Sequence, residues 1–218
     1  MTEFSDLRRM MVDGQLRTFD IQDSTVLDAM GRVPREFFVD DSERALAYAD
    51  RGVPFKEGAR SLLSPMVLAR MLQAAKIKKG ERALDISGAT GYAGAVLRDM
   101  GCRVAAWEPD MAFRARMKEA YVSAGFADID VLGGDDISGL PAHGLFDVIL
   151  VNGCCEEEPA ALFPLLAEGG RLVVIMKNSA AQSVRVFQRS GNEIGSSFVG
   201  HGNGPMIDLF SRKAAFVF

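Results

Sequence analysis

The stretch RALDISGATGYAGAVL, Arg82–Leu97, decides the fold. An apolar run ends at the acidic Asp85, small residues with glycines at 88, 91 and 94 follow, and an apolar helical pattern comes next. A strand, a tight turn and a helix in this order form the first unit of an open α/β sheet, whose turn approaches a ligand. A dinucleotide loop requires G-x-G-x-x-G, and the first G-x-G is missing here, so the glycine pattern alone is a weak indication of a nucleotide.

Short runs rich in Val, Ile, Leu and Ala alternate with helical patterns from residue 78 onward. The expected strands lie within residues 80–87, 102–108, 129–134, 146–152 and 171–177, and the expected helices within 91–101, 109–125 and 158–170. This alternation predicts right-handed crossover units and a parallel sheet covered on both faces. The remainder, from residue 183 to the end, reads as two strands joined by a turn at 190–192, which favours an antiparallel edge.

The first 77 residues show helical patterns instead, within 5–16, 23–34, 41–50 and 64–77, with an ordered loop over 51–63. Asp23 and Ser64 stand where helix N-caps belong, and Pro65 occupies a first helical position. We therefore expect an N-terminal helical segment over residues 1–77, packed on a core over residues 78–218 in a single compact unit.

Composition and charge argue against several classes of protein. The chain has 218 residues, 48% of them hydrophobic and 25% charged, which is typical of a globular domain. A net charge of −4 without a basic run argues against nucleic-acid binding, and the apolar stretches are too short to span a membrane. Three cysteines (Cys102, Cys154 and Cys155) lack metal-ligand spacing, which predicts no metal site and favours a reducing, cytoplasmic location.

A polar residue follows each of the first four expected strands. These residues are Asp85, Glu108, Asp135 with Asp136, and Asn152. The carboxyl ends of parallel strands meet at one edge of a sheet, where ligands bind. Glu108 can accept hydrogen bonds from both hydroxyls of a ribose, and an acid after the third strand can accept one from an adenine amine. The pattern therefore predicts a site for an adenosine-type ligand.

An acidic rim suits S-adenosylmethionine (SAM), which carries a sulfonium and an ammonium group, better than a dinucleotide with two phosphates. A nicotinamide-dependent oxidoreductase is the less favoured alternative, because the pyrophosphate loop is missing. The candidate cofactor-binding residues are Asp85, Ser87, Gly88, Ala89, Gly91, Glu108, Asp135, Asp136 and Asn152.

Nearly the whole chain resembles the protein-L-isoaspartate O-methyltransferase family. The likeness rests on MVDGQLRTFDIQDSTVLDAMGRVPREFFV (11–39), ALAYADRGVPF (45–55), the opening stretch, and FDVILVNGCCEEEPAALFPLLAEGGRLVVIM (146–176). The resemblance implies an α/β, Rossmann-like SAM-dependent methyltransferase fold, with SAM as the cofactor. It also implies isoaspartyl residues of damaged proteins as the substrate, methylated on the carboxylate, and it matches Asp85, Glu108 and Asp135 to the family's cofactor-contacting acids.

The glycine loop departs from the family pattern, because Ser87 and Ala89 stand where the family has glycines. Glycine permits a positive φ or a close backbone approach to a ligand, so side chains there can strain the loop by about 1–3 kcal/mol. Alternatively, Gly88 re-forms the turn one residue along and preserves binding.

The segment before Pro65 departs as well. Alignment on Pro65 puts Leu63 at the family's serine position, which lies near the methyl acceptor, and Ser61 at its threonine position. Ser61 and Ser64 are the candidate catalytic residues, although helix capping suits Ser64 better. Arg60 is either a partner for the acceptor carboxylate or a solvated loop residue. Two alternatives follow from the departures: a catalytically weak homologue kept for binding, or a methyltransferase of a different carboxylate.

Overall fold

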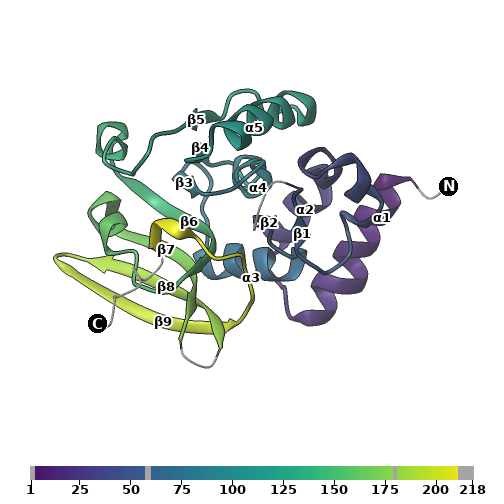
Figure 1. The fold of residues 1–218 in the computed structure, drawn as a ribbon. Helices are drawn as coiled ribbons and strands as arrows, with labels where there is room; N and C mark the ends of the chain where they lie inside the picture. Colours follow the sequence, from purple (N-terminus) through teal and green to yellow (C-terminus); the bar gives the residue numbers. More distant parts are fainter. Residues whose placement is uncertain (1–2, 57–59, 179–180, 211–218) are drawn as a thin grey trace, which may run out of the picture.

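A seven-stranded sheet in the order β5-β4-β3-β6-β7-β8-β9 forms the centre of the protein (Figure 1). The computed structural model describes residues 3–56, 60–178 and 181–210. The strands are β3 (Arg82–Ile86), β4 (Arg103–Trp107), β5 (Asp130–Leu132), β6 (Phe146–Cys155), β7 (Leu166–Lys177), β8 (Gln182–Ser190) and β9 (Glu193–His201). β3 to β7 run parallel, and β8 and β9 are antiparallel. The predicted fold class, with its antiparallel C-terminal edge, is confirmed; the end of that predicted edge, residues 211–218, lies outside the described residues.

One face of the sheet is covered by three α-helices, α3 (Pro65–Ala75), α4 (Tyr92–Asp99) and α5 (Met111–Ala124). Their buried side chains share a hydrophobic cluster with inward-facing strand residues such as Val148 and Val173. Helix α4 begins directly after the loop that ends β3, and its N-cap Gly91 has a φ of 91°, in the left-handed region. The predicted strand–turn–helix unit is therefore present.

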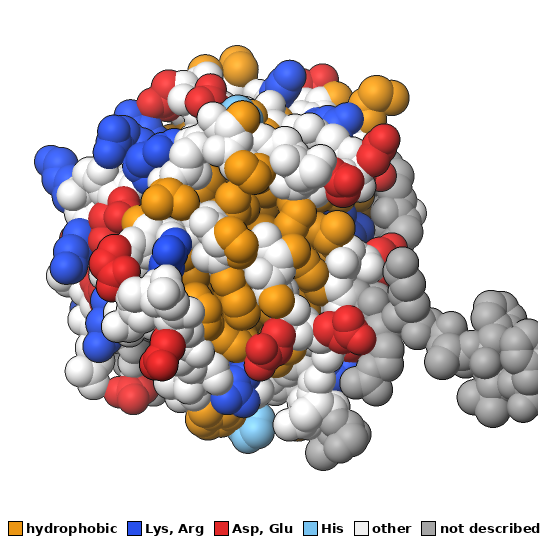
Figure 2. Space-filling view, turned by 90° about the vertical axis from the view of Figure 1, so that its left-hand side faces the viewer, with side chains coloured by type: hydrophobic (Ala, Val, Ile, Leu, Met, Phe, Trp, Pro, Cys, Tyr) orange, Lys and Arg blue, Asp and Glu red, His pale blue; other side chains and the backbone are white. Residues whose placement is uncertain are grey.

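Within the described residues, the other face of the sheet is covered by 3₁₀ helices and loops, and these helices are Leu140–His143, Ala160–Leu165 and Asp208–Phe210. An α-helix was predicted within 158–170, and this prediction is wrong. Pro164 lies inside the segment and has no N–H to donate, so only a short 3₁₀ helix forms before β7 starts at Leu166. Figure 2 shows hydrophobic side chains gathered on the side of the molecule that carries these elements.

The N-terminal segment begins with α1 (Phe4–Met11), which continues as a π-helical turn over Val12–Leu16 and a 3₁₀ turn over Arg17–Phe19. It then forms α2 (Ser24–Arg32), 3₁₀ helices at Arg35–Phe38 and Asp41–Leu46, and the two-residue antiparallel strands β1 (Val53–Pro54) and β2 (Ser61–Leu62). The helices predicted within 5–16, 23–34 and 64–77 are confirmed. The one predicted within 41–50 is a 3₁₀ helix, and the predicted loop over 51–63 contains β1 and β2.

The predicted caps hold two of these helices. Asp23 Oδ1 accepts from the backbone N–H of Thr25 at 2.9 Å, and Ser64 Oγ accepts from Val67 at 3.3 Å. Buried residues of the N-terminal segment belong to the same hydrophobic cluster as the helix-covered face of the sheet. The division of the chain at 77/78 stays a prediction. None of the described helices is long and apolar enough to cross a membrane.

Candidate functional site

The loop from Asp85 to Gly91 keeps a glycine-like backbone although two of its residues carry side chains. Ser87 has a φ of 56° and Ala89 a φ of 53°, both in the left-handed region. Gly88 does not have a positive φ, so the alternative that it re-forms the turn one residue along is wrong. Left-handed backbone costs a non-glycine residue about 1–2 kcal/mol. The loop therefore holds its shape against local strain.

Asp85 lies beneath this loop, fully buried. Its Oδ1 accepts from the side-chain amide of Asn152, which also donates to Ile86 O at 3.2 Å. A Cβ on Gly88 would lie 2.6 Å from Asp85 Oδ2, so the backbone approaches the carboxyl group as closely as only glycine permits. Burial raises the pKa of Asp85 to about 7, against the hydrogen bonds from Asn152 and the Gly94 backbone. These contacts make Asp85 and Asn152 supports of the loop.

Glu108 follows β4 and is fully buried beside the loop. Its Oε2 accepts from the Ala89 backbone N–H at 2.9 Å, and its Oε1 accepts from the Asp110 N–H at 3.2 Å. The Arg60 guanidinium donates to both oxygens, at 3.1 Å to Oε1 and 2.7 Å to Oε2. Arg60 Nη2 also donates to Ser87 O at 2.9 Å, so this arginine joins β4 to the loop.

Arg60 is not a solvated loop residue: in this structure it pairs with Glu108, and its pairing with an acceptor carboxylate stays a prediction. Its guanidinium lies 5.2 Å from the centre of the Phe113 ring, and its side chain is 20% exposed. A pairing between residues 48 positions apart leaves no local pattern in the sequence, so sequence analysis missed it.

Asp135 and Asp136 lie on the same edge of the sheet as Glu108. The Glu108 N–H donates to Leu132 O at 3.2 Å, and the two aspartates follow three and four residues later, both exposed. They line a hollow of about 380 Å³ together with Trp107. Asp136 Oδ1 accepts from the Ser138 N–H at 2.9 Å, and hydrogen bonds from Ser138 lower the pKa of Asp136. The structure thus places the predicted acids of β4 and β5 at the same edge of the sheet, although Glu108 does not line this hollow.

Arg114 contacts the backbone at the ends of both β4 and β5. Its Nη1 donates to Glu108 O at 2.9 Å and to Pro109 O at 2.8 Å. The same side chain lies against Gly133, where a Cβ would come within 2.4 Å of Arg114 Cδ, so a larger residue would displace the arginine. Arg114 therefore fixes the backbone at the end of β4, on which Glu108 depends.

The two candidate catalytic serines occupy different surroundings. Ser64 Oγ is engaged as the N-cap of α3, and Ser61 is half-buried on β2. Leu63, at the family's serine position, is buried, and its carbonyl accepts from Arg35 Nη2 at 2.7 Å. Arg35 is fully buried and also donates to Ala47 O at 2.7 Å. Its role could not be predicted from the sequence, because charged residues are rarely fully buried and its acceptors lie 12 and 28 residues away.

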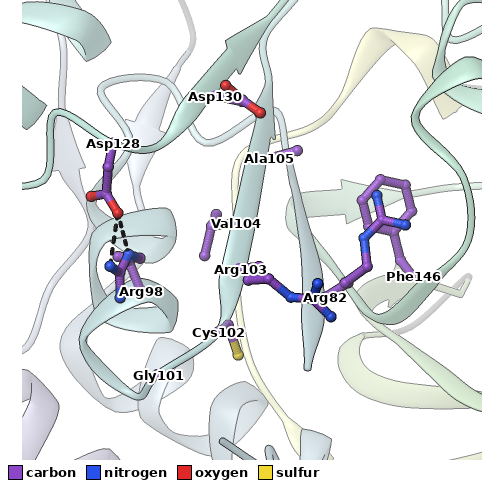
Figure 3. A pocket seen from close by; sticks show the side chains of 10 residues that line it. All are labelled: Arg82, Arg98, Gly101, Cys102, Arg103, Val104, Ala105, Asp128, Asp130 and Phe146. Carbon is purple, nitrogen blue, oxygen red and sulfur yellow. Dashed lines mark hydrogen bonds and ion pairs between the residues drawn. The ribbon is translucent and has the colours of Figure 1, made fainter. Parts of the chain in front are cut away.

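Another hollow, of about 280 Å³, lies at the amino ends of β3 and β4 (Figure 3). Arg82 and Arg103, which are paired across the two strands, line it with Arg98, whose ion pair to Asp128 measures 2.7 Å. Ligands of open α/β sheets bind at the carboxyl ends of the strands, so this hollow is not part of the candidate site. Among the described residues, no group of three or more His, Cys, Asp and Glu side chains could hold a metal ion.

Comparisons with known proteins agree with this architecture. The family model described as "Protein-L-isoaspartate(D-aspartate) O-methyltransferase (PCMT)" matches residues 8–199. Protein-L-isoaspartate O-methyltransferase 2 of Anaeromyxobacter sp. (strain Fw109-5) is 39% identical over 166 residues, 76% of this chain and 68% of the relative. Protein-L-isoaspartate O-methyltransferase of Koribacter versatilis (strain Ellin345) is 35% identical over 89% of this chain and 87% of its own.

Two solved structures share the fold. One, a protein-L-isoaspartate O-methyltransferase, has a TM-score of 0.82 and 23% identity, over 94% of this chain and 67% of its own. The other, from Plasmodium falciparum, is titled a putative enzyme of this kind in complex with S-adenosyl-L-homocysteine. It has a TM-score of 0.80 and 20% identity, over 93% of this chain and 98% of its own. The chain therefore belongs to the protein-L-isoaspartate(D-aspartate) O-methyltransferase family.

Proposed function

We propose that this protein is a SAM-dependent O-methyltransferase that methylates the carboxylate of isoaspartyl residues in damaged proteins. Membership of the family supports the reaction class and the substrate. The observation that carries the proposal is the hydrogen bond from Ala89 N to Glu108 Oε2 at 2.9 Å. It joins the loop after β3 to the acid after β4, the two elements between which an adenosine ligand binds in this kind of sheet.

The residues present fit such a cofactor. Three residues of the loop, Ser87, Ala89 and Gly91, have the left-handed backbone that a ligand-cradling turn requires. The buried hydroxyl of Ser87 has no hydrogen-bond partner within the described structure, so it is available to a ligand. A carboxylate such as that of Glu108 suits ribose hydroxyls, although Arg60 takes up two of its acceptor positions in this structure, and Asp135 lines a hollow at the same edge of the sheet. SAM, when bound, supplies a methyl group on a sulfonium centre.

Little side-chain catalysis is required of the chain. The acceptor carboxylate is already ionised at neutral pH. The protein has to hold the acceptor in line and exclude water from the methyl group. Asp85 and Asn152 keep the loop in shape, Glu108 orients the cofactor, and Ser61 stays a candidate for contact with the acceptor.

Methyl-ester formation on an isoaspartyl peptide tests the reaction, with the matched aspartyl peptide as the control substrate. We expect base-labile ester on the isoaspartyl peptide alone. Glu108→Gln should raise the Kd for SAM at least tenfold, since an amide accepts fewer hydrogen bonds from a diol than a carboxylate does. The matched control is Asp110→Asn, next to Glu108 but engaged in capping α5. Failure of the wild-type protein to bind SAM at millimolar concentration would contradict the proposal.

The proposed setting is the cytoplasm, without nucleic-acid or membrane partners. Three free cysteines, all buried, support a reducing compartment. The net charge of −4 supports a protein that does not bind nucleic acid. Fractionation of cells that carry a tagged copy tests the location.

A further inference from the structure

The Glu108 carboxylate has all its hydrogen-bonding positions in use. A carboxylate offers about four lone-pair sites. Backbone N–H groups of Ala89 and Asp110 take one site on each oxygen, and the Arg60 guanidinium takes the other on each. The backbone donors belong to the loop and to the start of α5, which are fixed parts of the fold. Arg60 is the donor that can leave.

A ribose diol has two donors and needs two acceptor sites on Glu108. It therefore competes with the two N–H groups of Arg60 for the same lone pairs. The Arg60 side chain also reaches the surface, since it is 20% exposed, whereas the Glu108 side chain is fully buried. Entry of a cofactor ribose thus requires the Arg60 side chain to give up Glu108.

Arg60 keeps support once it leaves Glu108. It precedes β2, and its guanidinium stacks 5.2 Å from the centre of the Phe113 ring on α5. A cation–π contact with an aromatic ring holds an arginine near the site while its planar donors turn to a new acceptor. The acceptor that the proposed function brings is itself a carboxylate, which matches the fork of a guanidinium.

We infer that Arg60 exchanges partners: it holds Glu108 when the cofactor is absent, and it binds the acceptor's carboxylate group when the cofactor ribose has taken Glu108. This inference rests on the proposed function. Arg60 is then a positioning residue that couples the two ligands, since cofactor binding frees the group that recognises the acceptor. By linkage the acceptor must strengthen cofactor binding by the same factor.

The test measures both affinities in one variant. Arg60→Gln removes the competitor, so we expect the Kd for SAM to fall about tenfold. It also removes the acceptor contact, so the Kd of an isoaspartyl peptide, measured in the presence of saturating S-adenosyl-L-homocysteine to prevent turnover, should rise about tenfold. Opposite changes in one protein distinguish this role from a structural one, which would weaken both ligands.

Two further variants serve as controls. Arg60→Lys keeps the charge without the planar fork, so it should bind SAM more tightly than wild type and lose less peptide affinity than Arg60→Gln. Arg98→Gln removes another ion-paired arginine, which lies on α4 beside the amino ends of β3 and β4, away from the candidate site. This variant should change neither Kd. Thermal unfolding of each variant checks that it is folded.

The outcomes separate the two proposals. If SAM binds wild type and Arg60→Gln equally well, the exchange is overturned and the proposed function stands. If Arg60→Gln weakens both ligands, Arg60 only supports the fold of the site, and the exchange is again overturned. If no variant binds SAM, the proposed function itself fails.

Discussion

Gly88 lies directly on the carboxyl group of Asp85: a Cβ at residue 88 would be 2.6 Å from Oδ2 and 3.2 Å from Cγ. The carboxyl group cannot retreat, because it is fully buried and held by Asn152. The close approach, and not a positive φ, is what requires glycine at this position.

Gly88→Ala should therefore lower the free energy of unfolding by about 2–3 kcal/mol, the cost of forcing an extra methyl into a packed interior. Gly14→Ala is the matched control, because Gly14 is in the π-helical turn and a Cβ there would meet nothing within 4 Å. It should raise stability by about 0.5–1 kcal/mol through helix propensity. Urea denaturation of both variants gives the comparison. Equal stability of wild type and Gly88→Ala would show that the loop can move away from Asp85.

Ser87→Gly should stabilise the protein by about 1 kcal/mol. Ser87 has a φ of 56° and a buried hydroxyl without a partner in the described structure, and glycine removes both penalties. Part of the gain is offset by the greater flexibility of glycine in the unfolded chain. Ala89→Gly, at a φ of 53°, should gain less, because it also removes a buried methyl group. A drop in the urea midpoint of Ser87→Gly would contradict the strain assigned to the loop.

Asp85 should make stability fall as pH rises. Burial raises its folded-state pKa to about 7, from an ordinary value of 3.8. Between about pH 4 and pH 7 the folded protein keeps a proton that the unfolded chain releases, so the folded state loses stability through this window, by about 2–4 kcal/mol in total. Asp85→Asn has no such proton. Its stability relative to wild type should increase from pH 4 to pH 7 and then level off.

The control for this pH dependence is Asp136→Asn. Hydrogen bonds from Ser138 lower the pKa of Asp136, so its contribution has the opposite sign and lies at lower pH. Urea unfolding at half-unit pH steps measures both differences. If the stability difference between Asp85→Asn and wild type stays constant from pH 4 to pH 7, Asp85 is ionised in the folded protein over that whole range.

Ser64→Ala separates the capping role of this serine from a catalytic one. Loss of the hydrogen bond from Val67 N to Ser64 Oγ, 3.3 Å long, should lower stability by about 1 kcal/mol. We expect kcat for ester formation to stay within twofold of wild type at a temperature where both proteins are folded. A larger loss of kcat with unchanged stability would support a catalytic role for Ser64.

Ser61→Ala tests the other candidate catalytic serine, with little change in stability expected because Ser61 is only half-buried.

The parts of the fold that could be predicted from sequence are those that local pattern determines. The alternation of apolar runs and helical patterns predicted the sheet, and the capping residues Asp23 and Ser64 predicted where two helices begin. Hydrophobic periodicity and helix capping both depend on residues that are close in the sequence. The segment around Pro164 was predicted wrongly, because its apolar pattern resembles that of an α-helix whereas the missing N–H of the proline prevents one.

The site was predictable only as far as the strand ends. Asp85, Glu108 and Asp135 come to one edge because parallel strands align their carboxyl ends. Contacts between distant segments were beyond sequence reasoning, and the pairing of Arg60 with Glu108 is the case that matters most. Whether Ser87 could adopt a left-handed backbone also depended on the tertiary packing around it.

Burial raises the pKa of Cys102 and Cys155 to about 12 and of Cys154 to about 11, so none of these thiols is ionised at neutral pH in the folded protein. A thiol reacts with alkylating reagents as its thiolate, so the native protein should be inert to iodoacetamide. Cys102 and Cys154 belong to the cluster under the α-helices, and Cys155 belongs to the cluster on the opposite face. The wild-type chain thus carries its own chemical reporters on both sides of the sheet, and the order of their alkylation reveals which side opens first.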